Sequence, residues 1–399
     1  MNKKLITIII VVLCVIALGI GIYFAWQKTR VILTPQSSSQ GSISGQTISG
    51  DNLAGLPLGS AAASKLSIIS DNTIYDYWIF DSNLSLTTSA SSTQKIQESG
   101  VFYMGRDGII YKVKVDGADE VLTSVPVENF QSLKSSFDGK RVIIKTNNTG
   151  TSKFVIYNSE NNIFESLVDK ITAVDFSPDG KKIAYFLANT KDLNKSDLIT
   201  KSLVDLKQKP TTLISFYQND FDLDWISQNK ITLISKPSAF YQASIWAVDV
   251  IKKTLSRLTA GEKDLNGLII NWSPDGKIGL QFSSFADGRN RVLNLINDQG
   301  EIKANIEFMT LPEKCFVSDP KIYCAIPKSI PDKASLPDDY LKNALYFVDS
   351  IYQIDITQNS FEEILNGSSL AIDAFGLKLA DGKLFFINKY DNRLYILGL

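Results

Sequence analysis

The pattern of apolar and polar positions divides the chain into three parts. Residues 5–26 carry no charged side chain and read LITIIIVVLCVIALGIGIYFAW. Residues 31–64 are rich in Ser, Gly and Gln, and their few aliphatic residues follow no period. From residue 65 onward, short alternating runs are separated by turns with Gly, Asp or Asn, which is typical of β-strands joined by hairpins. We therefore predict an anchor in 1–30, a linker in 31–64 and an all-β domain in 65–399.

The first part predicts a transmembrane helix. As an α-helix it would span roughly 30 Å, which is the thickness of a bilayer core. Tyr23 and Trp26 lie at its end, where interfacial aromatic residues are common, and the run is longer than that of a cleaved signal peptide. Two lysines and the α-amino group precede it, whereas Lys28 and Arg30 follow. This small excess predicts a cell-membrane protein with its C-terminal domain outside the cytoplasm.

The second part predicts a flexible tether. Chains of this composition behave as random coils, and about 30 residues span on the order of 30 Å. We expect such a tether to hold the C-terminal domain off the membrane without fixing its orientation.

One unit recurs through the third part: an aromatic residue, a turn rich in Pro, Asp and Gly, and a short apolar run. Its copies are VDFSPDGKKIAYF (174–186), INWSPDGKIGLQF (270–282), LKSSFDGKRVIIK (133–145), LDWISQNKITLIS (223–235), KCFVSDPKIYCAI (314–326) and LKLADGKLFFINK (377–389). Each copy predicts a β-hairpin, and two further short strands follow it, as in SIWAVDV at 244–250 and SRLTA at 256–260. Four strands every 40–50 residues or so is the period of a β-propeller. The predicted units are 72–125, 126–170, 171–216, 217–260, 261–308, 309–365 and 366–399, which makes seven blades.

The last unit ends at Leu399, directly after its third strand. A closed ring needs a fourth strand there, because an unpaired edge would otherwise remain. The segment KLSIIS at 65–70 has the right length and no other partner. We predict that it completes the last blade.

The Ser-Pro-Asp-Gly turns at 177–180 and 273–276, each followed by a strand, resemble the repeat of the TolB-like (WD40-like) propellers. The Gly-His and Trp-Asp signatures of true WD repeats are missing, and two of the seven units carry the full turn. The resemblance covers about 65–399. It implies a propeller fold and, by analogy, a scaffold for protein contacts at the cell envelope, but it names no ligand.

The composition limits the chemistry. The chain has no histidine, so it can form neither a His-based catalytic triad nor a His-rich metal site. Its net charge is −1 and it has no basic block, which argues against nucleic-acid binding. It contains no Gly-x-Ser-x-Gly elbow, phosphate loop or dinucleotide fingerprint. We expect no cofactor and no catalytic activity.

Two cysteines, Cys315 and Cys324, flank the turn of one predicted hairpin. A turn near 319–320 places them directly opposite on adjacent strands, close enough for a disulfide. Two free buried thiols and a redox pair are the alternatives, although nothing nearby would lower a thiol pKa. A disulfide would suit an oxidising exterior.

Three aspartates, Asp220, Asp222 and Asp224, alternate along the segment NDFDLDW. Alternation places them on one face of a strand, where they are weak candidates for a Ca²⁺ site or for acid-base chemistry. However, Asp224 occupies the repeat position of Asp175 and Asn271. A polar residue there is a feature of the repeat, and we favour a lining or hydrogen-bonding role.

A long insertion, 327–348, separates the second and third strands of one unit and contains three prolines. A decorative loop is one interpretation. A loop stiffened by proline loses little entropy on ordering, however, and aromatic residues anchor interfaces. We therefore predict an interaction loop with Tyr340, Leu345, Tyr346 and Phe347.

Three functions remain open. The favoured one is a membrane-anchored, extracytoplasmic propeller that acts as a protein-binding scaffold at the cell envelope. The alternative is a carboxylate-dependent enzyme or a binding protein for envelope polysaccharide, with Asp220, Asp222 or Asp338 as acids. A ligand sensor is the third, although the four residues before the apolar segment leave no cytoplasmic output domain.

Overall fold

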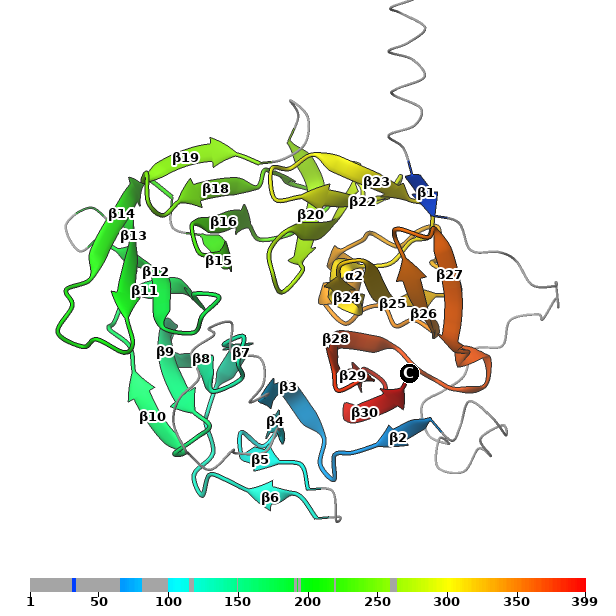
Figure 1. Cartoon of the computed structure of the whole chain (residues 1–399), viewed down its shortest axis with the longest axis horizontal. Helices are drawn as coiled ribbons and strands as arrows, with labels where there is room; N and C mark the ends of the chain where they lie inside the picture. Colours follow the sequence, from blue (N-terminus) through cyan, green and yellow to red (C-terminus); the bar gives the residue numbers. More distant parts are fainter. Residues whose placement is uncertain are drawn as a thin grey trace, which may run out of the picture.

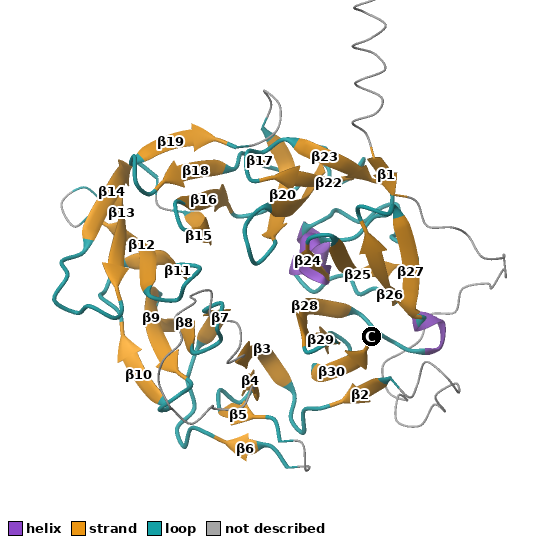
Figure 2. Ribbon diagram, viewed as in Figure 1, coloured by secondary structure: helices purple, strands orange, loops and turns teal. Residues whose placement is uncertain are grey.

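The computed structural model describes residues 31–33, 65–80, 100–114, 118–148, 150–189, 192, 195–218, 220–258 and 264–399. These residues form seven sheets arranged around one axis (Figure 1). Each sheet contains a blade of four antiparallel strands, and one of the seven carries two further strands, so the predicted seven-bladed β-propeller is confirmed. Strands and loops make up nearly all of the ring, and the helical segments are short (Figure 2).

The strands of the first three blades fall within their predicted units. The first blade contains β3 (Ile74–Phe80), β4 (Gly100–Gly105), β5 (Ile110–Lys112) and β6 (Glu120–Val121). The second contains β7 (Phe130–Ser135), β8 (Arg141–Asn148), β9 (Thr151–Asn158) and β10 (Ile163–Ser166). The third contains β11 (Ile171–Phe176), β12 (Lys182–Ala188), β13 (Ser196–Ser202) and β14 (Thr211–Phe216).

The next three blades follow the same plan. The fourth contains β15 (Phe221–Ser227), β16 (Lys230–Ser235), β18 (Trp246–Asp249) and β19 (Thr254–Arg257). The fifth contains β20 (Leu265–Trp272), β21 (Ile278–Ser284), β22 (Val292–Asn297) and β23 (Ile302–Ile306). The sixth contains β24 (Cys315–Ser318), β25 (Lys321–Pro327), β26 (Asp349–Asp355) and β27 (Ser360–Leu365), with η1 (Pro312–Lys314) before β24 and α2 (Asp338–Leu341) in the insertion.

The seventh blade joins the two ends of the described domain. It contains β28 (Ala374–Ala380), β29 (Lys383–Asn388), β30 (Arg393–Gly398) and β2 (Leu66–Ile68), with η2 (Gly367–Ser369) before β28. The outer strand β2 pairs antiparallel with β30, so that Leu66 faces Leu397 and Ile68 faces Tyr395. The predicted closure by residues 65–70 is therefore confirmed.

The fifth blade carries two additional strands that the repeat pattern does not predict. β17 (Gln242–Ala243) pairs with β20, and β1 (Val31–Leu33) runs parallel to β23 at the outer edge. The first three residues of the predicted tether thus form a strand. The predicted anchor, 1–30, and the remainder of the tether lie outside the described residues. Where the chain is described, no helix is both long and apolar enough to cross a membrane.

The core lies between blades because each sheet buries both of its faces. One cluster joins Phe186 of the third blade to Leu223 and Trp225 of the fourth. Another joins Trp78 of the first blade to Tyr157 of the second. The inward-facing apolar residues of the repeat thus pack against the neighbouring blade.

Packing between blades explains the glycine in the Asp-Gly turn of the fifth blade. At Gly276 φ is +67°, and an added Cβ would lie 1.9 Å from the carbonyl oxygen of Ile226 in the preceding blade. Within the same turn, the Ser273 hydroxyl donates to Asp275 at 2.6 Å, as Ser177 does to Asp179. The turn therefore needs glycine, because no side chain fits between the blades at this point.

Candidate functional site

A polar position in the inner strands connects neighbouring blades. Asp175 accepts a hydrogen bond from the Trp225 amide at 2.9 Å, and the Asn271 amide donates to the Cys315 carbonyl at 2.8 Å. These contacts join matching repeat positions of neighbouring inner strands, which therefore lie at the same height in the ring. The inner strands accordingly begin at the same face of the ring. We call this the upper face. The connections between blades, and the loops between second and third strands, also lie there.

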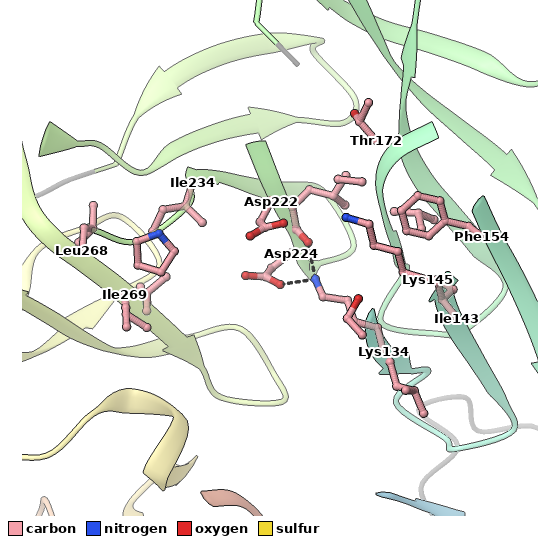
Figure 3. A pocket seen from close by; sticks show the side chains of 17 residues that line it. Lys134, Ile143, Lys145, Phe154, Thr172, Asp222, Asp224, Ile234, Leu268 and Ile269 are labelled. Carbon is pink, nitrogen blue, oxygen red and sulfur yellow. Dashed lines mark hydrogen bonds and ion pairs between the residues drawn. The ribbon is translucent and has the colours of Figure 1, made fainter. Parts of the chain in front are cut away.

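A pocket of about 350 Å³ opens between residues of the inner strands β7, β11, β15 and β20 (Figure 3). Lys134 Nζ lies 2.7 Å from Asp224 and 3.7 Å from Asp175. It also donates a hydrogen bond to the Leu223 carbonyl at 2.6 Å. Asp222 and Lys145 line the same pocket. Neither of these two has an ion pair within the described part of the chain.

Lys134 is held as a cation in this pocket. Burial lowers its pKa, but the charges of Asp175 and Asp224 outweigh this effect and hold the pKa above its ordinary value. Burial raises the pKa of Asp175, and Lys134 opposes that rise. A lysine nucleophile or base needs a lowered pKa, so this arrangement favours a permanent ion pair over covalent catalysis.

The structure brings two of the three predicted aspartates, Asp222 and Asp224, to this pocket. Asp224 is paired with Lys134, Asp222 lines the pocket, and Asp220 accepts a hydrogen bond from Gln218 at 2.8 Å. Alternation along β15 is as expected, since Phe221, Leu223 and Trp225 are buried. Among the described residues, no group of three His, Cys, Asp or Glu side chains is placed to hold a metal ion.

The insertion between β25 and β26 spans several blades at the upper face. Asp338 of α2 accepts a hydrogen bond from the Ala239 amide in the fourth blade at 2.6 Å. Arg291 of the fifth blade donates to the Ala334 carbonyl at 2.6 Å, and Lys389 of the seventh donates to the Tyr340 carbonyl at 2.9 Å. The insertion is therefore part of the folded ring. Asp338 is buried in these contacts.

The structure places the four residues of the predicted interaction loop at different depths. Tyr340 and Phe347 are buried, and Leu345 packs against the same core. Tyr346 alone of the four predicted residues is well exposed, at 44%. The rings of Tyr340 and Phe347 are turned inward because they cover a buried cation, Lys314.

Lys314 lies in a fully buried charge cluster beneath the insertion. Its ammonium is paired with Asp349 at 2.8 Å and with Asp373. Asp373 also accepts hydrogen bonds from the Tyr340 hydroxyl at 2.8 Å and from the Phe347 amide at 2.9 Å. The ammonium lies 4.9 Å from the centre of the Tyr340 ring. The cluster fastens the insertion to the sixth and seventh blades.

The two hairpin cysteines are opposite each other, as the turn at 319–320 requires. Cys315 pairs with Cys324 in the register of β24 and β25, and their Cα atoms are 4.1 Å apart. The structure joins their sulfur atoms in a disulfide, and both residues are buried. This geometry corresponds to the predicted disulfide between the two strands.

Exposed aromatic residues lie on loops of the upper face beside the insertion. Phe240 and Tyr241, exposed to 60% and 76%, follow Ala239, whose amide binds Asp338. Phe285, exposed to 63%, begins the loop after β21. In that loop, a Cβ on Gly288 would lie 2.7 Å from the insertion backbone. We call these three residues the aromatic group. Their repeat positions are variable loops, so no periodic signal marks them.

Comparisons with known proteins identify the fold. No protein-family model and no curated protein matches the chain. An oligogalacturonate lyase from Vibrio parahaemolyticus is 11% identical over 75% of this chain and 85% of its own, with a TM-score of 0.51. The tricorn protease is 11% identical over 75% of this chain and 32% of its own, with a TM-score of 0.48. A candidate TolB protein of Agrobacterium tumefaciens is 19% identical over 52% and 76%, with a TM-score of 0.36. This chain thus spans about a third of the tricorn protease chain. Similarity at such low sequence identity is evidence about the fold alone. By its fold, this chain is a seven-bladed β-propeller.

Proposed function

We propose that this chain is a membrane-anchored binding protein whose upper face carries the contact site for a protein partner at the cell envelope. The observation that supports this most directly is the aromatic group, Phe240, Tyr241 and Phe285, exposed on two loops that both contact the insertion. Large exposed aromatic side chains are costly in water and are enriched where proteins bind one another. Their loops are held by the insertion, so little conformational entropy would be lost on binding.

The location of the domain follows from the apolar run at residues 5–26. An anchor of this length would place the propeller at the membrane, and the charges that flank it favour the outer side. A domain held at a membrane meets partners in the same membrane at high effective concentration.

Catalysis is the weaker alternative. Paired carboxylates for glycoside hydrolysis need a common substrate between them, at about 5–10 Å. Asp224 is instead neutralised by Lys134, and Asp338 is buried against Ala239. The central pocket presents fixed charges and hydrogen-bonding groups, which suit binding better than bond cleavage.

Point variants test the proposed surface better than loop deletion, because removing the insertion would also remove the buried Tyr340 and Phe347. The full chain would be captured from membranes in detergent after crosslinking, beside a variant with all three aromatic residues changed to Ser. We expect specific partners to be lost from this variant. A matched control replaces Val204 and Leu206, exposed on a turn of the third blade at the opposite face, with Ser.

Equal capture by the wild type and the aromatic variant would contradict the proposed surface. Protease treatment of intact cells tests the location separately. We expect the propeller to be digested without lysis, and protection until lysis would overturn the outward orientation.

A further inference from the structure

A second pocket at the upper face lies where the first, sixth and seventh blades meet. Its volume is about 300 Å³. Its lining comes from the loop after β4, from η1, from the insertion and from the loop after β29. This volume is at the lower end of the range for small-molecule sites, so the pocket has room for one ring.

The walls of this pocket are held in place by their own contacts. Lys389 donates hydrogen bonds to the carbonyls of Tyr340 and Leu345, at 2.9 and 3.4 Å. Its ammonium lies 3.5 Å from the centre of the Tyr340 ring and 4.9 Å from that of Tyr346. Arg106 donates to the Asn392 side chain at 2.6 Å. Such preformed walls need little reorganisation to bind a ligand.

Two lining groups retain capacity for a ligand. Within the described residues Glu313 has no hydrogen bond and no ion pair, although Lys314 and Lys389 are near enough to influence it, and burial raises its pKa. The fork of Arg106 makes one side-chain hydrogen bond, to Asn392, and is exposed. The pocket therefore offers an acceptor on one side and a planar cationic donor on the other.

These groups select the chemistry of the ligand. A guanidinium fork matches a carboxylate, which it can bind through two parallel hydrogen bonds. Glu313 can accept hydrogen bonds from the hydroxyl groups of such a ligand, and Lys389 adds a positive charge to the lining. Tyr346 is exposed at the rim, and its ring centre lies 5.6 Å from that of Tyr390. Aromatic faces of this kind can cover the C–H face of a sugar ring.

We propose that this pocket, between Arg106, Glu313 and Tyr346, binds a single sugar ring that carries a carboxylate. The site is independent of the aromatic group and lies over different blades. A propeller with both sites would bind a protein partner and an acidic glycan on the same face.

The test uses the full chain in detergent and saturation-transfer NMR with glucuronate, glucose and glycine as probes. We expect saturable binding of glucuronate and weaker binding of glucose and glycine. Arg106→Gln should raise the Kd for glucuronate about tenfold, as expected for loss of a charge-assisted contact. Arg289→Gln is the matched control, because this exposed arginine lies on another loop of the same face, beside Asp287.

Three results would overturn the proposal. One is the absence of saturable glucuronate binding to folded protein, and another is an equal Kd for wild type and Arg106→Gln. The third is equal or tighter binding of glucose or glycine, which would remove the case for a carboxylated sugar. An unchanged melting temperature in the Arg106 variant ensures that weaker binding reports on the pocket.

Discussion

The buried cluster of Lys314, Asp349 and Asp373 predicts an unusual pH dependence of stability. Two carboxylates share one ammonium, and all three side chains are fully buried. Asp349 accepts hydrogen bonds through Oδ2, from Lys314 and the Ala374 amide, while its Oδ1 is buried and has no hydrogen-bond partner among the described residues. Burial raises the pKa of Asp349 from 3.8 to about 6, with Asp373 adding to the rise and Lys314 opposing it.

The sign of the effect follows from this raised pKa. A carboxyl group with a higher pKa in the folded state binds its proton more tightly there than in the unfolded chain. Asp349 therefore contributes stability below about pH 4, and this contribution is lost as the pH rises through about 6. Between pH 4.5 and pH 7, a shift of this size corresponds to about 2 kcal/mol.

The variant Asp349→Asn isolates this contribution, because the amide does not titrate. Urea unfolding of the full chain, followed by tryptophan fluorescence, would give the free energy of unfolding of both proteins at pH 4.5 and pH 7. We expect the variant to gain about 2 kcal/mol relative to wild type between these two pH values. A constant difference across this range would refute the raised pKa.

Asp373→Asn serves as the contrasting variant. Asp373 accepts from the Lys314 ammonium, the Tyr340 hydroxyl and the Phe347 amide, so its charge is well satisfied. Its replacement removes the better-bonded anion of the pair. We expect a loss of roughly 3 kcal/mol or more at both pH values.

Other parts of the fold give three further predictions. Deleting residues 65–70 removes β2 and leaves β30 with an open edge, so the melting temperature should fall by roughly 5 °C or more, whereas an unchanged value would show that β2 does not stabilise the ring. Gly276→Ala should cost at least about 2 kcal/mol in urea unfolding, because its Cβ would meet the Ile226 carbonyl; Gly382→Ala, with a similar φ of +68° and open space around it, should cost about half as much or less. Replacing Cys315 and Cys324 together by Ser opens a loop with a sequence separation of 9 and should cost about 2.5 kcal/mol under oxidising conditions, and an equal stability of both proteins would contradict the stabilising role of the bond.

The blade plan can be predicted from the sequence because its signals are local. Hairpin turns like the one at Ser273–Gly276, and alternation like that along β15, recur in six of the seven units, with a period that four short strands require. Closure by residues 65–70 also follows, since a ring cannot leave the edge of its last blade unpaired.

The features of the upper face are harder to predict because their partners are distant in sequence. Lys314 and Asp373 are 59 residues apart, and no period connects them. One signal was present: in the repeat, Lys314 takes the first position, where Val174, Leu223 and Ile270 are aliphatic. A lysine in an aliphatic position of a core repeat indicates a buried ion pair, and this explains why the insertion turns Tyr340 inward.

The closure of the seventh blade has a mechanical consequence. Load from the N-terminal side first meets β1, which three residue pairs join to β23. Once those pairs have separated, the load reaches β2, which three residue pairs join to β30. Because the two strands are antiparallel and the Gly398 amide binds the Lys65 carbonyl at the end of the ladder, such a pull separates the pairs one after another from that end. The ring would therefore open first between β2 and β30, at low force and before any complete blade is stretched.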